Sequence, residues 1–91
     1  MNKNPWIRRT AEMEAIAVGE EWIVLHADRL TVTKMNEVGS FLWSELKSDG
    51  DADSLSRKLQ ERYEIDESTA SRDVRQFVSE LEKVGLVTYA S

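Results

Sequence analysis

One junction constrains the fold of this chain more than any other feature. A run of alternating residues from Leu30 to Met35 passes directly into an amphipathic segment that starts at Glu37, and Asn36 stands between them. Alternation with a period of two is typical of a half-buried strand. Asparagine is a favoured N-cap, because its side-chain oxygen accepts a hydrogen bond from a free amide of the first helical turn. The junction predicts a strand followed at once by a helix over residues 37–47.

Two further strands are predicted before this junction. Residues 14–18 and 22–26 are rich in β-branched and aromatic side chains, and short turns separate them from each other and from the strand at 30–35. Short connections favour antiparallel neighbours. The first third of the chain therefore predicts a meander of three strands.

Two more helices are predicted in the second half. A helix at about 53–63 has a narrow apolar stripe, and a longer helix at 67–84 begins at a capping residue, Asp66. Gly85 suits the left-handed position that commonly follows a helix. Residues 86–89 are predicted either as a short last strand or as an extended tail.

Together these elements predict an α+β, winged-helix-like fold, in which a three-stranded antiparallel sheet is followed by three helices. A chain of 91 residues is long enough for one small domain. Residues 1–12 include Pro5 and few large apolar side chains, and they are predicted as an N-terminal arm. Residues 13–91 are predicted as the single folded domain.

Composition narrows the function classes. The chain has no cysteine, so it offers neither a disulfide framework nor a thiolate. No apolar run approaches the roughly 20 residues that span a bilayer, and the first residues lack the apolar core of a signal peptide. A cytoplasmic protein without a membrane segment is therefore expected. The net charge of -5 comes entirely from residues 36–91, which disfavours binding to the phosphates of a nucleic acid.

Neither a catalytic site nor a metal site is predicted. His26 lies near Asp28, but no second histidine, cysteine or serine-nucleophile motif completes a constellation. The aspartates at 49, 51 and 53 resemble alternating calcium ligands, yet the sixth and twelfth positions of that loop are Ser54 and Gln60, where an EF-hand needs Gly and Glu. No cofactor is expected.

Helix 67–84 is a candidate DNA-recognition helix, with Arg72, Arg75 and Gln76 as possible contacts. Against this, acidic side chains outnumber basic ones over residues 66–84. A winged-helix DNA-binding transcription regulator therefore stays as the alternative function.

The strand at 30–35 has the character of an edge strand. Leu30 and Val32 are expected to share one face, and Thr31 and Thr33 are expected to point outward. An edge strand has spare backbone amides and carbonyls that must be blocked, solvated or paired with another chain. On the residues alone, both a protected edge and an edge that accepts an added peptide strand stay open.

The chain resembles the pyrroloquinoline quinone biosynthesis protein D (PqqD) family over residues 22–88. The resemblance lies in four parts: the valine-rich hairpin, the Met35-Asn36-Glu37-Val38-Gly39 junction with Trp43 seven residues after Asn36, the residues from Leu59 to Tyr63, and those from Asp73-Val74 to Gly85-Leu86. The Asn-Glu-Val-Gly form followed by a tryptophan looks like the small leader-binding subunits of lasso-peptide maturation systems.

The resemblance implies a non-catalytic, chaperone-like protein. It would act as a RiPP recognition element: it would hold the leader of a ribosomally synthesised precursor peptide and present it to a maturation enzyme, either a radical enzyme or a leader peptidase. The leader would pair with the strand and lie in a groove beside helix 67–84, with Val32 also shaping the groove floor. The implied peptide-binding residues are Thr31, Val32, Thr33, Lys34, Asp73, Arg75, Gln76 and Val78. A subunit that only stabilises an enzyme is a further alternative. The leader sequence and the oligomeric state are left open.

Overall fold

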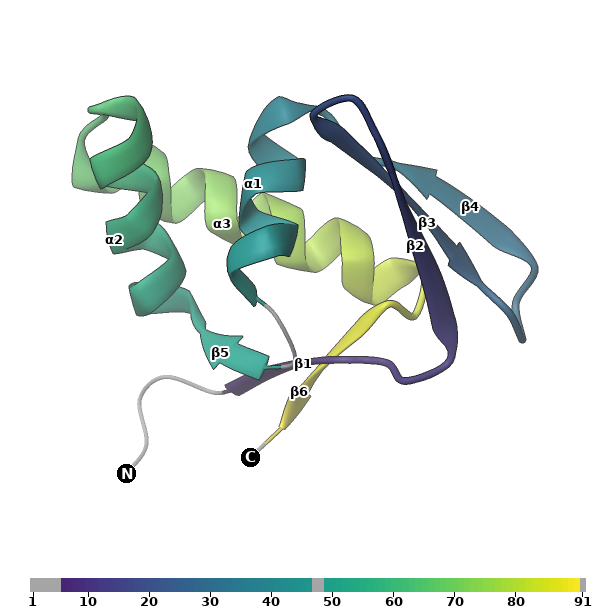
Figure 1. The fold of residues 1–91 in the computed structure, drawn as a ribbon. Helices are drawn as coiled ribbons and strands as arrows, with labels where there is room; N and C mark the ends of the chain where they lie inside the picture. Colours follow the sequence, from purple (N-terminus) through teal and green to yellow (C-terminus); the bar gives the residue numbers. More distant parts are fainter. Residues whose placement is uncertain (1–5, 47–48, 91) are drawn as a thin grey trace.

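The computed structural model describes residues 6–46 and 49–90. One antiparallel sheet has the predicted meander, with strand order β2-β3-β4, and it stands to one side of the helices (Figure 1). Its strands are β2 (Met13–Val18), β3 (Glu21–His26) and β4 (Thr31–Lys34). The α+β, winged-helix-like class and the three-stranded sheet are confirmed.

Three helices follow, and the predicted capping residues set the starts of the first and the third. They are α1 (Glu37–Leu46), α2 (Ala52–Tyr63) and α3 (Glu67–Lys83). The Asn36 side chain accepts a hydrogen bond from the Gly39 amide at 2.8 Å, and Asp66 does the same for Thr69 at 2.8 Å. Gly85 has a φ of 80°, the left-handed conformation expected after α3. Residue 47, the predicted last residue of the first helix, lies outside the described residues.

A second three-stranded sheet was not predicted. Its order is β5-β1-β6, with antiparallel pairs, and it lies beneath the helices in Figure 1. The strands are β1 (Trp6–Arg9), β5 (Asp49–Asp51) and β6 (Val87–Ala90). The Ser-Asp-Gly-Asp sequence of residues 48–51 is typical of a turn, yet residues 49–51 form a strand, and residue 48 lies outside the described residues. Of the two possibilities for residues 86–89, the short strand is correct, and the division of the chain after residue 12 stays a prediction.

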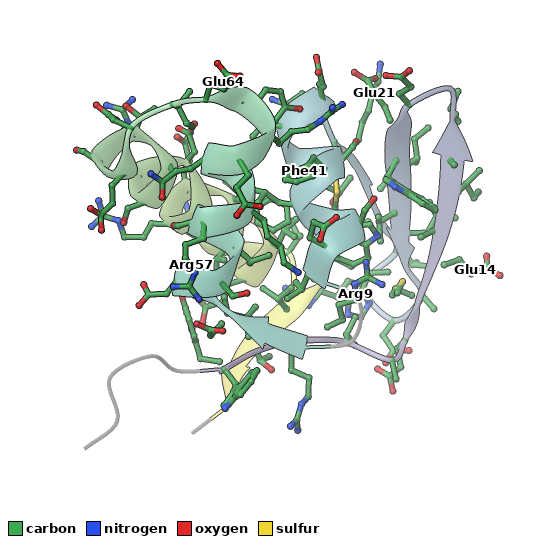
Figure 2. All side chains as sticks on the ribbon, turned by 60° about the vertical axis from the view of Figure 1, so that its left-hand side comes forward. Arg9, Glu14, Glu21, Phe41, Arg57 and Glu64 are labelled. Atoms are coloured by element: carbon green, nitrogen blue, oxygen red, sulfur yellow. The ribbon has the colours of Figure 1, made fainter. Side chains whose placement is uncertain are left out.

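The second sheet is joined to the core by side chains of β1. Ile7 is 0% exposed and belongs to the same apolar cluster as Leu42, Trp43 and Val78. The Arg9 guanidinium lies over the Trp43 ring, 3.8 Å from the ring centroid, and donates a hydrogen bond to the Trp43 carbonyl. Figure 2 shows Arg9 at the base of α1. Burial lowers the pKa of Arg9 from its usual value, but the group keeps its charge.

We predict that Ile7→Ala destabilises the protein by about 2–4 kcal/mol, because it removes fully buried apolar atoms and leaves a cavity. Arg8→Ala is the matched control on the same strand, since Arg8 is exposed, and it should change the free energy of unfolding by less than about 0.5 kcal/mol. Urea denaturation followed by tryptophan fluorescence measures both. Equal stabilities of the two variants would show that β1 is not anchored in the core.

Candidate functional site

The register of the β2-β3-β4 sheet decides which side chains of β4 face the helices. Val24 of β3 is 0% exposed, and its partner across the β3–β4 pair is Thr33. Directly opposed residues share a face, so Thr31 and Thr33 point toward the helices, and Val32 points away and is 68% exposed. The prediction that the threonines face outward was wrong. The two threonines are half-buried and the one apolar residue of the strand is exposed, which is opposite to the usual pattern.

The backbone amides and carbonyls of β4 also alternate in direction from one residue to the next. The Met35 amide donates to the Trp22 carbonyl at 2.9 Å, which makes that pair a hydrogen-bonded pair of the ladder. In an antiparallel ladder such pairs alternate, so Thr33 and Thr31 also direct their backbone groups toward β3. The amides and carbonyls of Val32 and Lys34 therefore point away from β3. Because β4 is the last strand in the order, these groups form the free edge of the sheet.

A hollow lies beside the end of this edge, between the start of α1 and the middle of α3. It has a volume of about 290 Å³ and is lined by Asn36, Val38, Gly39, Asp73, Gln76, Phe77 and Glu80. Asn36 is two residues after Lys34, so the chain leads from the free edge directly into the wall of the hollow. The Gln76 amide donates to the Glu80 carboxylate at 3.4 Å. The hollow thus combines an aromatic wall with an acidic rim.

The structure separates the four predicted residues of α3. Asp73 and Gln76 line the hollow, whereas Arg75 is exposed without lining it and Val78 is buried in the core at 1% exposure. The peptide-binding roles of all four remain predictions. Phe77 and Glu80 were missed, although both share a helical face with Asp73 at spacings of four and seven residues. That spacing is visible in the sequence, but only the position of α1 shows that this face borders the hollow.

The other polar groups near the sheet are structural. His26 is 6% exposed, and its Nδ1 atom accepts a hydrogen bond from the Arg29 amide at 3.3 Å, which closes the β3–β4 turn. The buried Thr31 hydroxyl has no hydrogen-bond partner among the described residues.

Across the described ranges, no group of three or more His, Cys, Asp or Glu side chains is placed to hold a metal ion. Within the same ranges, no helix is long and apolar enough to cross a membrane.

Two solved structures have a similar fold. The fold is similar to that of a solved structure described as TbiB1 in complex with the TbiA(beta) leader peptide, with a TM-score of 0.84, 24% identity, and coverage of 92% of this chain and 99% of that one. It is also similar to a lasso peptide synthetase B1 complexed with the leader peptide, with a TM-score of 0.77, 17% identity, and coverage of 90% and 96%. No curated protein matches the chain.

The family comparison covers most of the chain. The model described as coenzyme PQQ synthesis protein D (PqqD) matches residues 21–87, which run from β3 to the first residue of β6. This match includes the free edge, the capped junction and both helices that line the hollow. The chain therefore belongs to the PqqD family.

Proposed function

We propose that this protein recognises the leader region of a ribosomally made precursor peptide by strand addition to β4. The free edge carries the proposal: Val32 and Lys34 direct their backbone amides and carbonyls away from β3, where an extended peptide would pair with them. Thr31 and Thr33 contribute no backbone groups to the edge, because theirs point toward β3. This narrows the predicted strand contacts from four residues to two.

Main-chain pairing is tolerant of sequence, so specificity needs side-chain pockets. The hollow between α1 and α3 is a candidate, since Asn36 connects its wall to the end of β4. Its acidic rim, Asp73 and Glu80, would suit a leader side chain with an apolar stem and a basic head. Phe77 supplies the apolar surface against which such a stem would pack.

The likeness to two solved leader-peptide complexes supports this proposal. In it, the protein makes and breaks no covalent bonds. It holds the leader so that the attached core peptide is presented to a maturation enzyme at an effective concentration of about millimolar. That enzyme would be a radical enzyme or a leader peptidase, and because precursor peptides are made on ribosomes, we place this step in the cytoplasm.

The charge distribution argues against the alternative of a DNA-binding regulator. The α3 face beside the sheet carries Asp73 and Glu80 at the hollow, where a recognition helix would need basic or neutral groups. The overall charge of -5 adds a repulsive field toward any polyanion.

We predict that Val32→Pro weakens leader binding by about tenfold or more, because proline removes an amide from the free edge and blocks strand addition. The fold should survive, since that amide makes no bond to β3. Fluorescence anisotropy with the labelled leader encoded nearest to the gene measures the affinity, with a scrambled leader and a DNA duplex as controls.

Thr33→Pro is the matched variant one residue further along β4. It removes an amide that points toward β3, so it should lower the free energy of unfolding by about 1–3 kcal/mol. Unchanged leader affinity in folded Val32→Pro would refute strand addition at β4. Saturable binding of the duplex but not of the leader would instead favour the regulator.

A second prediction concerns the acidic rim. Leader affinity should fall as ionic strength rises from low to physiological, since the interaction would join opposite charges at a solvent-exposed site. In the variant Asp73→Asn/Glu80→Gln this salt dependence should become smaller, while the fold is kept because neither side chain is buried. Titrations of wild type and variant at both ionic strengths test this prediction. Equal salt dependence of the two proteins would exclude the rim as the site that binds a basic segment of the leader.

A further inference from the structure

The face of the β2-β3-β4 sheet that points away from the helices, called the outer face below, carries an apolar patch between the charged side chains of Glu14 and Lys34. Two cross-strand pairs, Ile16 with Ile23 and Leu25 with Val32, cover its centre. Ile16 is 50% exposed and Val32 is 68% exposed. A sheet packed on helices through one face normally presents polar side chains on the other. Ile16 and Val32 leave much of their apolar surface exposed in the monomer, so a partner surface is the feature they fit.

Leu30 extends this surface at the β3–β4 turn. It is 87% exposed and has a φ of 56°, a left-handed conformation that is unfavourable for a leucine. Beside it lies a hollow of about 640 Å³, whose apolar lining includes Leu25, Leu30 and Val32. A polar or glycine residue at position 30 would suit both the backbone and the solvent better. A large apolar side chain held there is consistent with a contact to another protein.

The rim of this hollow is acidic. Glu12, Glu14 and Asp28 border it, and Figure 2 shows Glu14 projecting from β2 away from the helices. Arg29 in the same turn donates to the Lys83 carbonyl at 3.2 Å, so its charge is directed to the C-terminal end of α3 rather than to the rim. A complementary surface would be apolar at its centre and basic at its edge. A second copy of this chain would instead bring the same acidic rim against its own, which like charges disfavour.

We infer that the outer face binds the maturation enzyme, through an apolar patch flanked by lysine or arginine on the enzyme. The inference rests on the proposed leader recognition and adds the surface through which the bound leader is delivered. Val32 belongs to both surfaces, because its backbone lies on the free edge and its side chain lies on the outer face. An enzyme docked there is directly beside the strand that the leader would join.

The test uses the full chain with Ile16→Thr/Leu30→Asn, two changes outside the leader edge. Threonine keeps a high strand propensity, and asparagine tolerates the left-handed conformation, so the fold should be retained. The matched control is Trp6→Thr, which removes a 52% exposed aromatic side chain from the other sheet. The probe is the purified leader peptidase or modifying enzyme encoded beside the gene, immobilised for biolayer interferometry, and anisotropy with the labelled leader is measured in parallel.

The inference predicts that the double variant binds the enzyme at least about tenfold more weakly, while its leader affinity and the control's affinity for the enzyme stay at the wild-type values. If the double variant binds both the enzyme and the leader with wild-type affinity, the outer face is not the enzyme-binding surface. The proposed function is then unaffected. Absence of leader binding by the wild-type protein overturns the proposed function instead. A wild-type dimer that the double variant abolishes, detected by sedimentation, identifies a second copy as the occupant and also overturns the inference.

Discussion

The one-sided pairing of β4 is the constraint on which the rest of the site depends. Because β3 satisfies the backbone of alternate residues only, the other residues of β4 keep amides and carbonyls that face outward. The same alternation divides the side chains, so that the threonines face the helices and Val32 faces solvent. One short strand therefore provides three different surfaces: a packed face, a free edge and an exposed face. A register shift of one residue would move each side chain to the opposite face and would place the backbone groups of the threonines at the free edge.

This division holds only if β4 is fixed relative to the helices. The junction at Asn36 gives one fixed point, because the cap starts α1 two residues after the strand ends. The Ser40 side chain gives another, since its hydroxyl accepts from the Trp22 amide of β3 at 2.9 Å and donates to the Met35 carbonyl at 3.2 Å. At the opposite end of α1, Arg9 contacts Trp43 and ties the second sheet to the same helix. The helix α1 is thus held from both sheets, which keeps the free edge and the hollow in a constant relationship.

Local signals in the sequence were enough to predict the three helices and the first sheet. Caps such as Asn36 and Asp66 act within one helical turn, and the β2-β3-β4 meander needs only neighbours along the chain. The second sheet escaped prediction because its strands are three or four residues long and come from both ends and the middle of the chain. Such pairings leave no periodic pattern.

The orientation of β4 was also not predictable from polarity. Its alternation of threonine and apolar residues indicated a strand correctly, but the usual assignment of apolar side chains to the core placed the wrong face inside. On α3, the helical spacing of Asp73, Phe77 and Glu80 was readable, yet Val78 was chosen as a site residue although it packs in the core. Where a functional surface is itself apolar, hydrophobicity alone does not separate it from the core.

The proposed division between edge and hollow has a consequence for how a leader is selected. Two residues at the free edge provide backbone groups that any extended peptide satisfies, so this contact adds affinity with little discrimination. Discrimination then falls to the hollow, where an acidic rim that met an apolar leader side chain would lose solvation without gaining a partner. We expect moderate affinity from an exposed site of this kind, because solvent and salt screen its charges. Moderate affinity suits a protein that must release each leader after the enzyme has acted, because tighter binding would slow dissociation and limit turnover.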